Sequence, residues 1–362
     1  MKTNLYSQTL FSLIALFMVT LTLVGCGDGG KREIMNVSYD PTRELYEAYN
    51  EKFTEHWLAK TGEQILIDQS NGGSGSQAKK VAEGLEADVV TLALGYDIDL
   101  IGENIPNALP TDWVKAFPNN SCPYVSTIVF LVKKGNPKNL KDWDDLAQDG
   151  VAVVTPNPRT SGGARWNYLA AWGWQLKHEL GTLDPAFLRD PANAEKVNAA
   201  NEKAFTLVQK IHLNAKATGM PEGARSATNL FVRDGEGDVL LAWENEAMKA
   251  VYGDGNTEYE IVYPSVSIVA EPSVAVIGTT VERKGTRDIA EEYLNYMYTE
   301  EIQRLIMENF YRPCDEKLLA EKPELFGTLE LFRIDDVFGT WKEVQEKHFS
   351  NGGVFEKMMK EN

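Results

Sequence analysis

Four short segments place glycine, serine or aspartate where an apolar run gives way to a helix-forming run. The clearest is TPNPRTSGGARWNYLAAW, residues 155–172. The preceding VAVVTP is β-branched, as in a strand buried on both faces, and the Ala-, Leu- and Trp-rich run predicts a helix over 164–180. Ser161 is a good N-cap residue, and Gly162 and Gly163 let the backbone approach a ligand closely. Unpaired N–H groups meet the positive end of the helix dipole here, so the turn predicts either an anion site or a structural cap.

Three further turns share this pattern. Asp40 ends the apolar run EIMNVSYD and stands before a proline, and Ser74 lies in NGGSGS directly after QILIDQS. Ala224 lies in GARS before another helical run. Two of the four turns lie before residue 80 and two lie after residue 160, so a cleft between two α/β lobes would aim all their N–H groups at one small ligand.

The elements that must position these turns alternate between strands and helices. Strands are predicted at 33–40, 64–70, 87–94, 151–156 and 238–243, and this alternation indicates parallel sheets whose turns form one binding edge. A helix after Asp40 carries an apolar stripe with a spacing of four residues: Leu45, Tyr49, Phe53 and Trp57. A late strand at 271–278 is expected to return to the first lobe.

Charge and length narrow the class of protein. The chain has 362 residues, 43% of them hydrophobic, which is enough for two ordinary domains. Its formal net charge of -17 excludes nucleic-acid binding by bulk electrostatics, because phosphate backbones need a basic face. Any anion must therefore be held by local groups.

The N-terminus predicts export and lipidation. An apolar run from Leu10 to Val24 follows Lys2 and ends in LVGC, a pattern typical of a lipoprotein signal peptide over 1–25. The run is too short for a membrane span, which needs about 20 residues. Cys26 is expected to carry the lipid and to begin a tether over 26–32.

The other cysteines, Cys122 and Cys314, could form one disulfide or remain two free thiols in an oxidising compartment. Without a C-x-x-C pair, and with four scattered histidines, the sequence predicts neither a metal site nor a cofactor.

A secreted serine hydrolase is the alternative from another class. Ser76 and Lys79 fit the S-x-x-K pattern of penicillin-recognising enzymes. The accompanying SDN and KTG runs are absent, and no G-K-[ST] follows a glycine-rich loop, so we expect no enzyme and no nucleotide site.

Long ordered motifs give the chain a family resemblance. NVSYDPTRELYEAYN, DQSNGGSGSQA, ADVVTLALGYD, TPNPRTSGGARWNYLAAWGW, GARSATN and DVLLAWENEA resemble the periplasmic sulfate-binding proteins, and FYRPCD and HFSNGGVF extend the resemblance to the C-terminus. This implies an α/β fold of the two-lobed periplasmic-binding-protein kind (type II), with a mostly parallel sheet flanked by helices in each lobe and the ligand between the lobes. Lobe 1 would comprise 33–130 and 270–362, and lobe 2 would comprise 131–269.

The resemblance also implies the binding residues. Sulfate would accept hydrogen bonds from main-chain N–H groups, one hydroxyl and one indole, supplied by Asp40, Ser74, Ser161, Gly162, Gly163, Ala224 and Trp243. Arg165 and Arg225 resemble arginines that brace this site without touching the anion.

A pocket made only of donors suits sulfate, which is fully ionised and only accepts hydrogen bonds. Monohydrogen phosphate would leave its proton without an acceptor, at a cost of about 1–3 kcal/mol. Thiosulfate and then molybdate are the nearest alternative ligands.

The implied function is a monomeric, lipid-anchored receptor of an ABC importer. It would be exported to the periplasm or the outer face of the cytoplasmic membrane, capture sulfate there and deliver it to the membrane permease.

Overall fold

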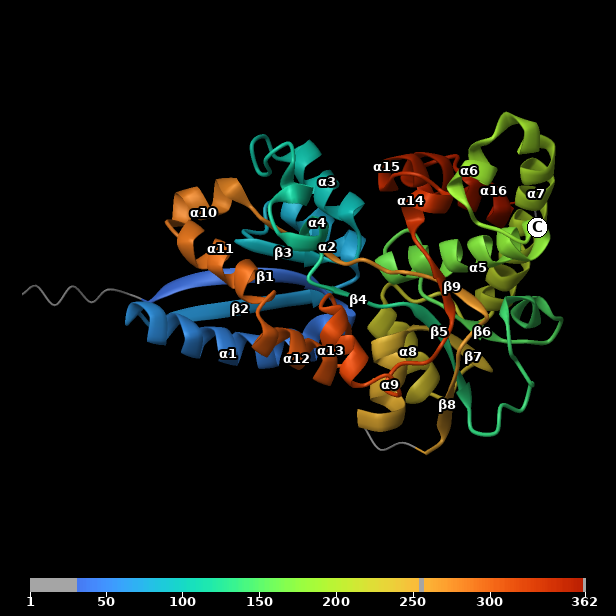
Figure 1. Ribbon diagram of the computed structural model, residues 1–362, viewed down its shortest axis with the longest axis horizontal. Coiled ribbons are helices and arrows are strands. Elements are labelled where there is room, and N and C mark those ends of the chain that lie inside the picture. The colour runs from blue at the N-terminus through green and yellow to red at the C-terminus, as the bar shows by residue number, and fades with distance from the viewer. Residues whose placement is uncertain (1–30, 254–256, 361–362) are drawn as a thin grey trace, which may run out of the picture.

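Two β-sheets, each covered by helices, form the two halves of the molecule in the computed structural model (Figure 1), which describes residues 31–253 and 257–360. We call the half built on the first sheet lobe 1, at the left of Figure 1, and the half built on the second sheet lobe 2. Cys26 and the predicted signal peptide lie outside the described residues. Among the helices described, none is long and apolar enough to cross a membrane.

Lobe 1 contains the strand order β10-β3-β1-β2. The strand β1 runs parallel to β2 and β3. The late strand β10 pairs antiparallel with β3, so the chain returns to this lobe near its predicted position. The strands are β1 (Arg32–Tyr39), β2 (Ile65–Gly72), β3 (Val89–Leu92) and β10 (Ser273–Val276). The main helices are α1 (Arg43–Thr61), α2 (Ser74–Ala82), α3 (Gly95–Asn104), α4 (Pro118–Ser121), α10 (Gly278–Lys284), α11 (Arg287–Tyr296), α12 (Glu300–Glu308) and α13 (Glu316–Glu321).

The predicted apolar stripe of α1 packs into the core of lobe 1. Leu45, Tyr49, Phe53 and Trp57 are all buried there, together with residues of α11 and α12. The aromatic-rich stripe thus attaches the first helix of the chain to late segments of the same lobe.

Lobe 2 contains the order β6-β7-β5-β8. The strands are β5 (Ile128–Lys133), β6 (Val153–Val154), β7 (Val239–Trp243) and β8 (Tyr259–Val262). The strand β5 runs antiparallel to both β7 and β8, and only β6 and β7 pair in parallel. The expectation of a mostly parallel sheet therefore fits lobe 1 better than lobe 2, where β5 enters directly from lobe 1 without a crossover helix.

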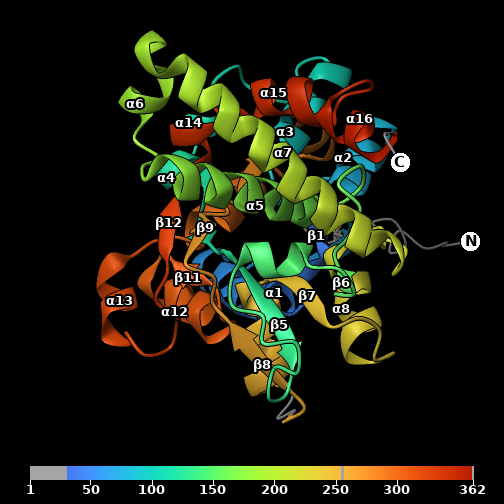
Figure 2. The same cartoon turned by 90° about the vertical axis from the view of Figure 1, so that its right-hand side faces the viewer.

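The helices of lobe 2 are α5 (Gly162–Leu180), α6 (Pro185–Arg189), α7 (Ala194–Lys216), α8 (Ala224–Val232) and α9 (Glu244–Met248). The helix α5 is buried from Gly162 to Leu176, as its nearly all-apolar sequence requires. Figure 2 shows α7 lying across α5, with which it shares the largest hydrophobic core.

The C-terminal segment packs on lobe 2 and not on lobe 1, which corrects the predicted division. It contains β12 (Glu330–Phe332), α14 (Ile334–Val337), α15 (Trp341–Val344) and α16 (Val354–Lys360). Phe332, Phe355 and Met358 are buried in the same core as α5 and α7. Gly173 of α5 has no side chain to obstruct the Phe332 ring, so β12 can lie against α5.

Two further boundaries differ from the prediction. The second sheet begins at Ile128, before the predicted start of lobe 2 at residue 131, and Arg32, predicted to belong to the tether, already pairs with Ile65 in the first sheet. The chain crosses between the lobes at Ser126 and Ala270, which form a β-bridge, and again between α13 and β12. Short pairs flank these crossings: β4 (Tyr124–Val125) with β11 (Arg312–Pro313), and β9 (Val266–Ile268) with β12.

Candidate functional site

A small cavity of about 10 Å³ lies between the two lobes. All seven predicted binding residues line it, although they come from five separate parts of the sequence. The complete lining is Tyr39, Asp40, Pro41, Gly72, Gly73, Ser74, Ser161, Gly162, Gly163, Ala224 and Trp243.

Four helical N-termini meet at this cavity. Asp40 begins a 3₁₀ turn that continues into α1, and Ser74, Gly162 and Ala224 are the first residues of α2, α5 and α8. The first N–H groups of a helix have no acceptor within the helix. The cavity is therefore surrounded by main-chain donors at the positive ends of helices from both lobes.

Ser161 caps α5 as predicted. Its Oγ accepts a hydrogen bond of 3.3 Å from the Ala164 N–H, and only 2% of the residue is exposed. Because Oγ is already an acceptor of that bond, its hydroxyl hydrogen is available to an acceptor inside the cavity.

Ser74 presents its main chain to the cavity. Its Oγ donates to Asp97 Oδ2 at 2.5 Å and accepts from the Ala93 N–H at 3.0 Å. Both functions of the hydroxyl are used within lobe 1, which leaves the Ser74 N–H as its donor toward the cavity.

Trp243 places an unpaired indole at the cavity. The residue is 2% exposed, and among the described residues its Nε1 has no hydrogen-bond partner. Tyr39 lies beside it, with ring centroids 5.3 Å apart. A buried donor without a partner is costly, so this N–H is suited to donate to an acceptor held in the cavity.

Two glycines are required by close packing around the cavity. A Cβ on Gly162 would stand 2.7 Å from the Ala93 Cβ of lobe 1, and one on Gly163 would overlap the Trp243 indole nitrogen. Backbone N–H groups reach the cavity only because no side chains intervene.

Arg165 joins the lobes at one side of the site. Its Nη1 donates to Asp97 Oδ1 at 3.0 Å and its Nε donates to the Pro158 carbonyl at 2.9 Å. The side chains of Arg165 and Asp97 are 6% and 1% exposed. Since the other Asp97 oxygen holds Ser74, the arginine braces a cavity residue through this carboxylate.

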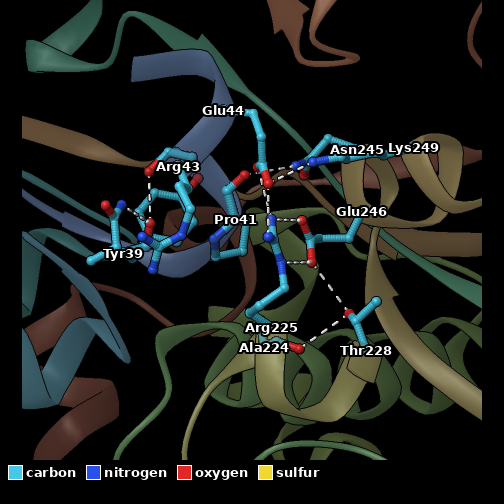
Figure 3. Close-up of polar contacts among 12 residues, drawn as sticks. Tyr39, Pro41, Arg43, Glu44, Ala224, Arg225, Thr228, Asn245, Glu246 and Lys249 are labelled. Atoms are coloured by element: carbon cyan, nitrogen blue, oxygen red, sulfur yellow. Dashed lines mark hydrogen bonds and ion pairs between the residues drawn. The ribbon is translucent and has the colours of Figure 1, made fainter. Parts of the chain in front are cut away.

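Arg225 joins the lobes at the other side (Figure 3). It donates two bonds of 2.8 Å to Glu44 of α1 and is also held by Glu246 of its own lobe, at 2.9–3.0 Å. Lys249 reaches the same Glu44 carboxylate at 2.6 Å. Burial opposes ionisation of Glu44, but the bonds from Arg225 and Lys249 outweigh it and lower the pKa of Glu44 to about 2.

The acidic partners of both arginines were not predicted from the sequence. Asp97 and Glu44 lie far from Arg165 and Arg225 along the chain, and neither carries a local signal for such a role. Asp40 does not cap its own helical turn, because Tyr39 occupies the cap position and no side-chain bond forms there. Burial raises the pKa of Asp40.

The two described cysteines are free thiols. Cys122 is buried and donates to the Tyr124 carbonyl, while Cys314 donates to Gln303 Oε1 at 3.2 Å. Burial raises the pKa of the Cys122 thiol. The structure therefore favours two thiols over the disulfide that the sequence left open.

The hydrolase constellation is not assembled. Lys79 forms an exposed pair with Glu83 at 3.6 Å, and no hydrogen bond between described residues joins it to Ser76. A larger cavity of about 570 Å³ lies in lobe 1 beside Trp113 and Arg287, and it contains none of the predicted site residues.

Two α/β lobes that meet around a small, donor-lined cavity define a solute-binding protein. Residues 36–312 match the family model described as bacterial extracellular solute-binding protein. The chain is 49% identical over 328 residues to the sulfate-binding protein of Escherichia coli, covering 91% of this chain and 93% of that one. It is 41% identical over 351 residues to the thiosulfate-binding protein of Pseudomonas aeruginosa, with 96% and 99% covered.

A solved relative has the same architecture. The sulfate-binding protein SubI from Mycobacterium tuberculosis superposes with a TM-score of 0.74 at 28% identity, covering 88% of this chain and 99% of that one. The chain belongs to the bacterial extracellular solute-binding proteins, and within them to the sulfate- and thiosulfate-binding family that its motifs predict.

Proposed function

We propose that this protein captures a sulfate ion between its lobes for an ABC importer. The observation that carries the proposal is the cavity at which unpaired donors converge, among them the buried Trp243 Nε1 and the N-termini of α2, α5 and α8. Asp40, Ser74, Gly162, Gly163 and Ala224 would donate main-chain N–H groups, Ser161 its hydroxyl and Trp243 its indole.

The donor set explains how an acidic chain can hold a dianion. Helix termini provide the local positive potential, and each hydrogen bond to a charged group contributes about 1.5–3 kcal/mol. Arg165 and Arg225 bond to carboxylates, so they act by holding the lobes together and not by neutralising the ligand.

Selectivity for sulfate over phosphate follows because all the proposed binding groups donate hydrogen bonds and none accepts one. Sulfate offers only acceptors, whereas the proton of monohydrogen phosphate would be buried unpaired at a cost of about 1–3 kcal/mol. Thiosulfate is the second candidate, because a relative named for it is 41% identical over nearly the whole chain. Molybdate is the third.

The setting of the receptor is part of the proposal. Membership among extracellular solute-binding proteins supports export, and LVGC at 23–26 supports a lipid on Cys26 that keeps the protein beside the membrane permease. One chain supplies every residue of the cavity lining, so a monomer suffices. Capture and release involve no bond making or breaking, and we propose no enzymatic activity.

We assign residues to the two lobes of this receptor by the sheet and the hydrophobic core to which they belong. We propose that 32–125 with 271–321 form one rigid body and that 128–268 with 330–360 form the other. The bridge between Ser126 and Ala270 would lie at the hinge.

Isothermal titration of the protein beginning after Cys26 tests the ligand. Sulfate, thiosulfate, molybdate and phosphate are titrated in turn, and we expect one-to-one sulfate binding with no heat from phosphate. Tighter thiosulfate or molybdate binding would overturn the proposed specificity, and silence from all four would overturn the proposed function.

A further inference from the structure

The guanidinium of Arg165 lies near two aromatic rings in addition to its hydrogen-bond partners. Its central carbon is 5.9 Å from the ring centroid of Tyr96 and 5.7 Å from that of Phe349. Both distances are within the range of cation–π attraction, which is stronger when the cation is desolvated. The side chain of Arg165 is only 6% exposed.

The two rings belong to different lobes. Tyr96 is on α3 of lobe 1, next to the Asp97 that bonds Arg165. Phe349 ends the turn Gln345–Phe349 in the C-terminal segment of lobe 2, and its ring contacts Tyr168 of α5 with centroids 5.1 Å apart. The contact with Phe349 is therefore internal to lobe 2, whereas the contact with Tyr96 exists only when the lobes meet.

We propose that Tyr96 is a positioning residue for ligand capture. Its ring covers the Arg165 guanidinium when the lobes close. This inference rests on the proposed function. Phe349 holds the guanidinium from its own lobe, and Tyr96 covers it from lobe 1 while Asp97 accepts its hydrogen bond. The ring replaces water on a face of the cation that the hydrogen bonds to Asp97 and Pro158 leave free.

The contact between Tyr96 and Arg165 is linked to the cavity through neighbouring residues of both lobes. Arg165 follows Gly162 and Gly163 on the first turn of α5, and its partner Asp97 holds Ser74 at 2.5 Å. Stabilising this contact therefore favours the closed arrangement in which donors of both lobes face the anion.

Stopped-flow tryptophan fluorescence with sulfate tests Tyr96 directly. Tyr96→Leu removes the ring face, and we expect sulfate to dissociate about 3- to 10-fold faster with little change in association rate. Tyr96→Phe keeps the ring face and is expected to behave as wild type within about 2-fold. The midpoint of thermal unfolding without ligand should be equal in all three proteins, because the contact is absent when the lobes are apart.

The same change in a variant that lacks the Arg165 guanidinium tests whether Tyr96 acts through this cation. In Arg165→Met, adding Tyr96→Leu should change dissociation no further, since the cation is gone. An unchanged rate in Tyr96→Leu, an equal defect in Tyr96→Phe, a lowered unfolding midpoint without ligand, or a full effect in the Arg165→Met background would each overturn the proposal. If wild type binds none of the oxyanions, the proposed function and this inference fall together; if wild type binds sulfate normally, only the inference is at stake.

Discussion

Arg225 of α8 and Glu44 of α1 form a two-bond ion pair, with both distances 2.8 Å, that joins lobe 2 to lobe 1. Glu246 fixes the arginine within its own lobe, and Lys249 adds a second cation at Glu44. The pair can form only when the lobes are in contact, so its free energy contributes to closure and through closure to ligand affinity.

Glu44→Gln is expected to weaken sulfate binding about 3- to 10-fold. The side chains of Arg225 and Glu44 are 23% and 32% exposed, so the pair is partly screened and contributes about 1 kcal/mol, near the upper end for exposed pairs. Titration calorimetry at two salt concentrations measures the loss. Asp234→Asn is the control, because Asp234 pairs with its neighbour Arg233 at the exposed surface of a single lobe. Equal affinities in wild type and Glu44→Gln would contradict a role for this pair.

Trp243→Phe isolates a single donor. The change removes the unpaired Nε1–H and keeps an aromatic ring against Tyr39. Loss of one hydrogen bond to a charged ligand is expected to lower sulfate affinity about 10-fold or more, as measured by calorimetry. Ser161→Ala should give a loss of the same order. Unchanged affinity in Trp243→Phe would show that the indole does not contact the ligand.

Gly162→Ala tests the close approach of the lobes. The added Cβ would stand 2.7 Å from Ala93 of lobe 1, so we expect closure to be impeded and sulfate affinity to fall about 10-fold or more. The clash crosses the lobes, and the unfolding temperature without ligand should therefore stay unchanged. Gly95→Ala is the matched control at the first position of α3, where the nearest atoms to an added Cβ are 3.7 Å away. An equal effect of the two changes would contradict the packing argument.

His212 makes stability depend on pH. Burial lowers its pKa to about 4, from an ordinary value of 6.5. As pH falls below 6.5 the unfolded chain gains a proton at His212 that the folded protein does not, so His212 should contribute a fall of about 1.4 kcal/mol per pH unit in the free energy of unfolding until pH 4. His212→Leu should reduce the slope by that amount, as measured by urea unfolding between pH 7 and pH 4.5. An unchanged slope would show that the ring is hydrated in the folded protein.

Much of the candidate site could be predicted because its donors are local features. The conformational preferences of Ser161, Gly162 and Gly163 predict a helix N-terminus. Any helix that begins there leaves its first N–H groups without an acceptor in the helix. The apolar stripe of α1 was predicted for the same reason, because its spacing reports one buried face.

The pairings between distant residues could not be predicted in this way. Nothing local at Glu44, Asp97 or Tyr96 indicates that each meets an arginine from the other lobe, because side-chain partners depend on how the lobes approach. The packing of 330–360 on lobe 2 likewise depends on burying Phe332 and Phe355 beside α5 and α7. No periodicity in that segment predicts this burial.

The sequence by itself thus determined the class of fold and the donors at the helix ends, since short-range backbone preferences and apolar spacing encode both. Only the tertiary structure decided that these donors share one cavity, that both described cysteines are free and that Arg165 and Arg225 hold the lobes together. Those outcomes depend on packing between segments far apart in the chain, where burial and geometry choose among many possible partners.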